Sequence, residues 1–220
     1  MTKALIYKEL RESCLIALGA LALYLFVVGR AVGLRMLPWE GADRGVIPFV
    51  GGSFSFSYAC ICAGFAVVLG FRQTVGEAIH GTWQFLLHRP LPRRRQIVLK
   101  LLVGAALYLT VGAIPILLYA WWAATPGTHA SPFLWSMTEP AWRIWLVTVL
   151  VYLGAFTSGL RPARWLGSRL WPLAASGSVV LIVSVIPFWP SAAAWLGILL
   201  LAGALLMANI ATVTGLRDYP

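Results

Sequence analysis

Six long apolar segments, separated by short polar ones, dominate the sequence. Each approaches or exceeds the roughly 20 apolar residues that an α-helix needs to cross the hydrocarbon core of a bilayer. They cover Ser13–Val28, Phe54–Phe71, Ile97–Trp122, Trp142–Leu160, Trp171–Ile186 and Ala192–Thr214. This pattern predicts an all-α, polytopic membrane protein with six transmembrane helices, in which residues 1–220 form a single transmembrane domain.

The composition agrees with a lipid environment. Apolar residues make up 60% of the chain and charged residues only 11%, whereas soluble domains average roughly 25% charged residues. Lys3, Lys8 and Arg11 precede the first apolar segment in the manner of a secretory signal, but Glu9 and Glu12 interrupt the basic stretch. We therefore expect an uncleaved first span.

Basic residues are distributed unequally between the two predicted faces of the membrane. The opposite face holds Arg30, Arg35, Arg44 and Arg143, and the other 13 of the 17 basic residues lie at the termini, after the second span and after the fourth. Because arginine and lysine collect on cytoplasmic connections, both termini are predicted to be cytoplasmic. The net charge of +10 is then a feature of topology, and no nucleic-acid partner is expected.

The predicted spans carry no Asp, Glu, Lys, Arg or His deep inside them. Pumps and ion-coupled transporters keep such groups at membrane depth, so the chain is expected to lack an energy source of its own. It has no Walker A sequence either, since its only lysines are at positions 3, 8 and 100. The three cysteines, Cys14, Cys60 and Cys62, have no metal-ligand spacing and are expected to be packed free thiols.

A short amphipathic helix is predicted over residues 74–88, between the second and third spans. Thr74 and Glu77 have the spacing of a capping box at its start, and Arg89-Pro90-Leu91-Pro92 ends it. At helical spacing one face is apolar, formed by Val75, Ile79, Trp83, Leu86 and Leu87, and the other polar, formed by Glu77, His80, Gly81, Gln84 and His88.

Two interpretations of this helix remain open. It could be a surface helix that ends in a cluster of charges, Arg93 to Arg95, which only fixes the topology. Alternatively, its apolar face could dock in a groove of a cytosolic partner and pass motion to the adjoining spans.

The stretch FRQTVGEAIHGTWQFLLHRPLPRRRQIVLKLL resembles the cytoplasmic loop of ABC-2 type transporter permeases. The resemblance consists of an acidic residue, a Gly-Thr-aromatic step, a Leu-Leu pair, an Arg-Pro stop, basic residues and a lysine in the next span. The matching positions are Glu77, Gly81, Thr82, Trp83, Leu86, Leu87, Arg89, Pro90, Arg93, Arg94, Arg95 and Lys100. The N-terminal stretch ALIYKELRES is similar to the amphipathic helix, here residues 2–12, that precedes the first span in that family.

The resemblance implies a permease subunit in the bacterial cytoplasmic (inner) membrane, paired with a second permease copy or a paralogue. ATP and magnesium would bind to separate ATPase subunits, so this chain would carry no cofactor and catalyse no reaction. The 74–88 helix would be the coupling helix, and the residues that contact the ATPase would be Glu77, Gly81, Thr82, Trp83, Leu86, Leu87, Arg89 and Pro90. The Arg161–Arg169 loop would be a second contact, or else simply a carrier of cytoplasmic charge.

The substrate class is less defined. Many family members have a sizeable outer segment between the fifth and sixth spans, whereas Pro187–Ser191 is almost a bare turn here. This difference favours export of a small or amphipathic substrate over export of a polysaccharide or a large lipid.

Two rival functions come from other classes. A polytopic membrane enzyme could use His80 with His88, or His129 with Glu139, although neither pair has a recognisable ligand spacing. A non-catalytic membrane anchor or scaffold is the other alternative.

Overall fold

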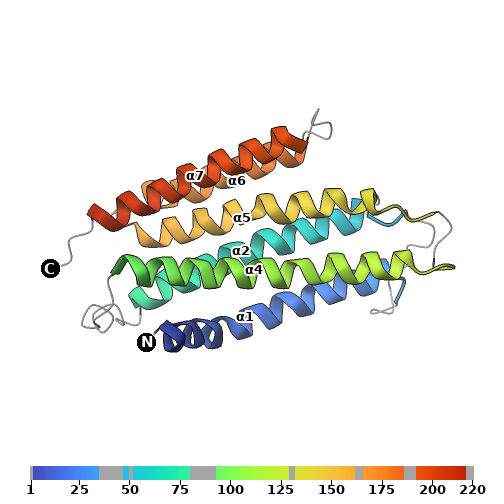
Figure 1. The fold of residues 1–220 in the computed structure, drawn as a ribbon, viewed down its shortest axis with the longest axis horizontal. Helices are drawn as coiled ribbons and strands as arrows, with labels where there is room; N and C mark the ends of the chain where they lie inside the picture. The colour runs from blue at the N-terminus through green and yellow to red at the C-terminus, as the bar shows by residue number, and fades with distance from the viewer. Residues whose placement is uncertain are drawn as a thin grey trace.

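The computed structural model describes residues 2–34, 47–49, 52–79, 93–128, 132–161, 166–185 and 192–216. Within these ranges all regular structure is helical, so the predicted all-α class is confirmed. The elements are α1 (Thr2–Ala31), α2 (Gly52–Ile79), α4 (Arg93–Ala124), the short 3-10 helix η1 (Trp135–Thr138), α5 (Glu139–Leu160), α6 (Leu166–Val185) and α7 (Ala192–Leu216). Figure 1 shows the long helices side by side along one common axis.

Five of these helices, α1, α2, α4, α5 and α7, are long and apolar enough to cross a membrane. This indicates an integral, multi-pass membrane protein. The predicted fifth span corresponds to α6, whose apolar part, Ser168–Ser184, is shorter than the other five. The start of α1 and the end of α7 lie at the same end of the bundle (Figure 1), as the prediction that both termini share one face requires.

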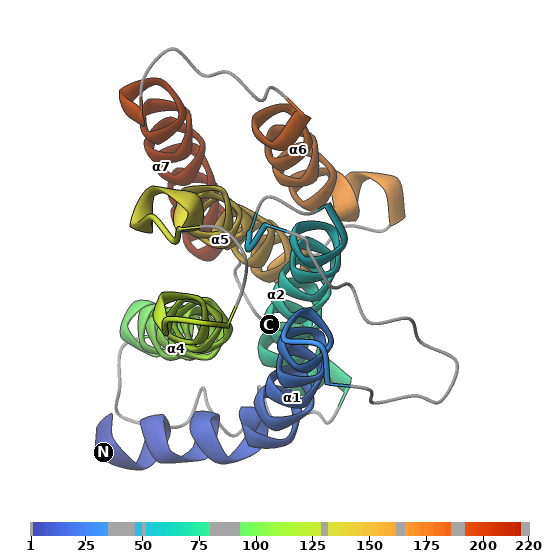
Figure 2. The same cartoon turned by 90° about the vertical axis from the view of Figure 1, so that its right-hand side faces the viewer.

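Helix α5 is the centre of the bundle. It packs against α2, α4, α6 and α7, while α1 packs against α2 and α4. Every residue from 151 to 160 is buried. Figure 2, viewed along the bundle, shows α5 between the α6–α7 pair and the group formed by α1, α2 and α4.

The N-terminal amphipathic helix predicted over residues 2–12 is not a separate element, because α1 is continuous from Thr2 to Ala31. Figure 2 shows its first turns running at an angle to the rest of the helix, below α4 in that view. Leu5, Glu9 and Ser13 are spaced four residues apart and are all buried, so they form one inward face. Leu5 therefore shares an inward face with two polar residues and does not face outward.

Helices α2 and α5 approach closely at glycines. A Cβ added to Gly70 would lie 2.8 Å from Ala155 Cβ and 2.9 Å from the backbone nitrogen of Phe156. A Cβ added to Gly159 would overlap Thr74 Oγ1. Small residues at such crossings allow membrane helices to pack backbone to backbone, which matters because lipid gives no hydrophobic driving force between helices.

Aromatic side chains donate hydrogen bonds to main-chain carbonyls of α4 inside the bundle. The Tyr58 hydroxyl donates to the Gly112 carbonyl at 2.8 Å, and the Trp145 indole donates to the Leu109 carbonyl at 3.2 Å. The two acceptors, Gly112 and Leu109, lie three and six residues before Pro115, which has no amide hydrogen. These two bonds join α2 and α5 to this part of α4.

The cysteine prediction is confirmed in part. All three thiols are free, but only Cys62 is packed inside, where it accepts a hydrogen bond from Tyr24 at 3.1 Å. Cys14 and Cys60 are exposed on the outside of the bundle, where a lipid-facing thiol meets no polar requirement. The expectation that all three are packed was therefore wrong for two of them.

The α2–α5 crossing leads to a stability prediction. Gly70→Ala should destabilise the protein by about 1–3 kcal/mol, because the added methyl meets backbone rather than a flexible side chain. Gly64→Ala is the matched control on the same helix, since a Cβ there has nothing within 4 Å. Thermal unfolding of the purified variants in detergent should show a lower Tm for Gly70→Ala only. Equal Tm values would contradict the close approach.

Candidate functional site: a buried polar cluster between α1, α2, α4 and α5

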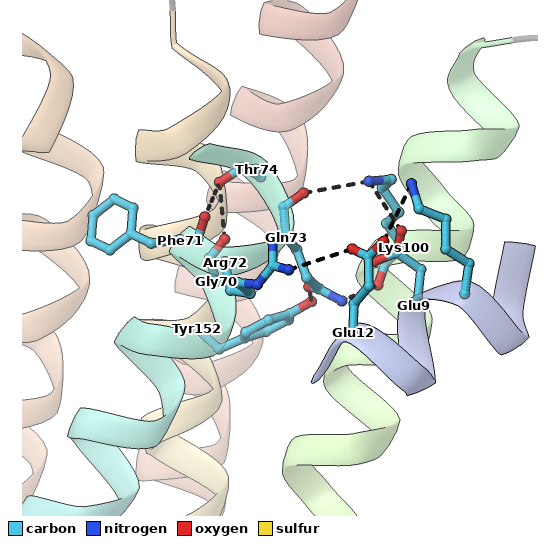
Figure 3. Close-up of polar contacts among 10 residues, drawn as sticks. Glu9, Glu12, Gly70, Phe71, Arg72, Gln73, Thr74, Lys100 and Tyr152 are labelled. Atoms are coloured by element: carbon cyan, nitrogen blue, oxygen red, sulfur yellow. Dashed lines mark hydrogen bonds and ion pairs between the residues drawn. The ribbon is translucent and has the colours of Figure 1, made fainter. Parts of the chain in front are cut away.

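A buried ion pair joins α1 to α4. Lys100 Nζ lies 3.1 Å from Glu9 Oε1, and both side chains are only 3% exposed. Lys100 Nζ also lies 3.5 Å from the main-chain carbonyl of Gln73 at the end of α2. One lysine therefore connects three helices, as Figure 3 shows.

Gln73 of α2 makes hydrogen bonds to both α4 and α5. Its Nε2 donates to the Lys100 carbonyl at 3.1 Å, and its Oε1 accepts from the Tyr152 hydroxyl of α5 at 2.7 Å. The same hydroxyl lies 3.0 Å from the Leu101 carbonyl. Glu9, Gln73, Lys100 and Tyr152 are thus connected by one ion pair and by hydrogen bonds, and we call these four residues the polar cluster.

A glycine makes room for the polar cluster on α4. A Cβ added to Gly104, one turn after Lys100, would overlap the Tyr152 hydroxyl and the Gln73 side-chain amide. Leu5, Ile97 and Leu101 are buried and belong to the same ends of α1 and α4. Since charged groups in a low-dielectric interior interact more strongly than in water, the exclusion of solvent tightens the Glu9–Lys100 pair.

Weaker ion pairs lie at the edge of the cluster. Arg72 Nη2 of α2 is 3.8 Å from Glu12 Oε2 of α1, and Lys8 Nζ is 3.7 Å from Glu12 Oε1 within α1. These side chains are about a third exposed, and such pairs contribute roughly 0–1 kcal/mol each. The Arg72–Glu12 pair nevertheless adds an α1–α2 contact beside the buried α1–α4 pair.

The cluster stands at both ends of the segment that resembles an ABC-2 coupling loop. Gln73 precedes residues 80–92, which we call the linking segment, and Lys100 follows them. The ends of α2 and α4 that flank the linking segment are therefore tied to each other, to the start of α1 and to α5.

Most of the predicted contact residues lie in the linking segment, outside the described residues: Gly81, Thr82, Trp83, Leu86, Leu87, Arg89 and Pro90. Glu77 lies within α2, although its side chain is not described. The predicted start of the coupling helix at Thr74 is wrong. Residues 74–79 continue α2 without a break, and Thr74 Oγ1 donates to the Gly70 carbonyl at 2.9 Å inside the helix instead of capping a new one.

Sequence reasoning missed the polar cluster. In the sequence, Lys100 is part of the family pattern, and Glu9 is only one of two acidic residues that interrupt a basic stretch. Two signals could have found the pair. Lys100 is the one cation after the start of its apolar run, and Glu9 shares a face with Leu5 and Ser13 at four-residue spacing.

The tryptophans of α4, η1 and α5 divide into two groups. Trp121 and Trp135 are 74% and 66% exposed, as interfacial anchors would be. Trp142 and Trp145 are instead half-buried, with ring centroids 5.1 Å apart in an edge-to-face contact. They belong to the packing of α5 more than to an anchor belt.

The rival enzyme residues are not brought together in the described part of the chain. His80, His88 and His129 lie outside it, and Glu139 is exposed at the start of α5. Among the described residues, no group of three or more His, Cys, Asp or Glu could hold a metal ion. The geometry of the polar cluster is that of a charge-paired joint between helices.

No family model, curated protein or solved structure matches the chain.

The buried pair makes an asymmetric prediction. Lys100→Met should destabilise the protein by about 3–5 kcal/mol, because Glu9 would keep a buried charge without its lysine. The double variant Glu9→Gln/Lys100→Met should recover most of this loss, since replacing a whole buried pair is often nearly neutral. Thermal unfolding in detergent measures both effects.

Lys8→Met is the matched control, because its ion pair with Glu12 is partly exposed and lies within one helix. It should change stability by no more than about 1 kcal/mol. A Lys8→Met variant as unstable as Lys100→Met would contradict the special role of burial.

Proposed function

We propose that the chain is the transmembrane permease subunit of an ABC-2 type ATP-binding cassette transporter. It pairs with a second permease copy or a paralogue, and separate ATPase subunits supply the energy. The substrate is a small or amphipathic molecule, and the direction is export from the cytoplasm.

The observation that carries the proposal is the placement of the polar cluster. The resemblance to ABC-2 permeases is concentrated between α2 and α4, and there the ends of both helices are joined through Gln73 and Lys100. A partner that pushes on the linking segment thereby acts on both helices together. Through Glu9 and Tyr152 the displacement also reaches α1 and α5.

The charge pattern supports docking on the same face. Lys3, Lys8, Arg11, Arg72 and Arg95 belong to the helix ends around the polar cluster, as expected of a cytoplasmic surface. A cytosolic ATPase would meet the protein at this end. The chain itself has no nucleotide-binding lysine motif, so the ATP-hydrolysing groups belong to the partner.

Affinity purification tests the assignment directly. The tagged chain, expressed together with its neighbouring genes and extracted in mild detergent, should retain an ATPase subunit, and the complex should hydrolyse ATP. The readout is the ratio of captured ATPase to tagged chain, with ATP turnover that vanadate suppresses. Recovery of a stable chain without any ATPase would refute the proposal.

A charge on the apolar face of the predicted coupling helix should break the contact. Trp83→Glu is expected to reduce the captured ATPase at least about tenfold, as the loss of a buried aromatic anchor would. Gln84→Glu, which adds the same charge to the predicted polar face, is the control and should retain the ATPase. Both variants should reach the membrane in equal amounts, and equal capture by the two would contradict the docking role of Trp83.

A further inference from the structure

Helix α1 is held mainly by the two helices that flank the linking segment. Within the described residues it packs against α2 and α4, whereas α6 and α7 pack against α5. Figure 2 shows α1 on the far side of α2 and α4 from α6 and α7. The position of α1 therefore depends on α2 and α4.

The contact between α1 and α2 contains an unfilled groove along its middle. An apolar groove of about 520 Å³ lies there, with Gly19 and Ala20 on α1 and Gly64 and Val68 on α2 among its lining residues. A Cβ added to Gly19 or to Gly64 would meet nothing within 4 Å. The groove leaves part of this face unfilled, while beside it Tyr24 of α1 donates to Cys62 Sγ of α2 at 3.1 Å and keeps the two helices in contact.

The contact is tight at the end that carries the polar cluster. The buried Glu9–Lys100 pair joins α1 to α4 at 3.1 Å, and the Arg72–Glu12 pair joins α1 to α2 at 3.8 Å. Figure 3 shows both pairs spanning from α1 to its neighbours, with Gln73 between them. The strongest described polar connection of α1 to the bundle is thus one ion pair next to the linking segment.

We propose that Glu9 and Lys100 form a mechanical joint that makes α1 follow α4 when an ATPase displaces the linking segment, an inference that rests on the proposed permease function. Both are positioning residues, because they act by holding α1 on α4. A buried ion pair suits this role, since it resists separation for as long as water is excluded. The apolar groove between α1 and α2 leaves room for α1 to shift about this end.

Distance measurements between spin labels test the joint. Labels at Leu18 on α1 and Leu181 on α6 report the movement of α1, and labels at Ala106 on α4 and Leu181 report the movement of α4. All three positions are exposed. The background is free of native thiols (Cys14→Ala, Cys60→Ala, Cys62→Ser), and two-tag purification isolates complexes that contain one labelled copy together with the ATPase.

In the wild type, trapping the ATPase with ATP and vanadate should shift both distances by a few ångströms, the scale of helix shifts in switching proteins. In Glu9→Gln/Lys100→Met the α4 distance should still shift, while the α1 shift should fall to less than half. The charge-reversed variant Glu9→Lys/Lys100→Glu should restore the α1 shift. Lys8→Met, which leaves the buried pair intact, should behave as the wild type.

The outcomes separate the two proposals. If the wild type captures no ATPase, the permease function falls and the joint falls with it. If the ATPase is captured and α1 shifts equally in the wild type and the neutral variant, only the joint is refuted. If the α4 distance fails to shift in both the neutral and the charge-reversed variants, the pair serves folding alone, and the joint is again refuted.

Discussion

The arrangement of the bundle depends on a buried carboxylate that requires a cation beside it. Glu9 lies inside the protein, in a region of low dielectric, and a carboxylate there is tolerated only with a cation beside it. Lys100 supplies that cation at 3.1 Å, and Gln73 and Tyr152 satisfy the groups around it. Because these four residues come from four helices, satisfying one charge also fixes how the ends of α1, α2, α4 and α5 meet.

The rest of the fold follows from close packing around α5. Glycines let the backbones of α2 and α5 approach closely, and the last ten residues of α5, 151 to 160, are all buried. The bundle thereby consists of two groups, α1 with α2 and α4 on one side, and α6 with α7 on the other, both attached to α5. The polar cluster lies in the first group, and its Tyr152 extends from the central helix that belongs to both.

Much of the fold could be predicted from hydrophobicity, because an apolar run long enough to cross a bilayer has few alternatives to a helix. The positions of α2, α4, α5 and α7 follow from such runs. Two helix boundaries could not be predicted from these apolar runs. Thr74 was expected to begin a new helix because Thr and Glu at that spacing favour a cap, but its hydroxyl bonds back to Gly70 within α2. The N-terminal arm was expected to be separate, although its charges are compatible with a continuous helix.

The candidate site was harder to predict, because its chemistry lies between residues far apart in the sequence. Local patterns can mark Glu9 and Lys100 one at a time, but no spacing rule connects the two residues. Their burial depends on the way α1 crosses the end of α4 (Figure 2), which is a property of the tertiary structure. The role of Tyr152 is harder still to predict, because a tyrosine in an apolar helix is common. Its hydroxyl can bond to Gln73 only because the fold places that side chain beside it.

The order of synthesis gives the Glu9–Lys100 pair a further consequence. Helix α1 is synthesised before α4, so Glu9 has no lysine partner at first. It must stay in contact with water until Lys100 has been made. The first turns of α1 can settle into their final position only once α4 has been inserted. This end of the bundle therefore assembles late. If synthesis stops before Lys100, the α1–α2 hairpin is left with Glu9 and without the cation that allows Glu9 to be buried.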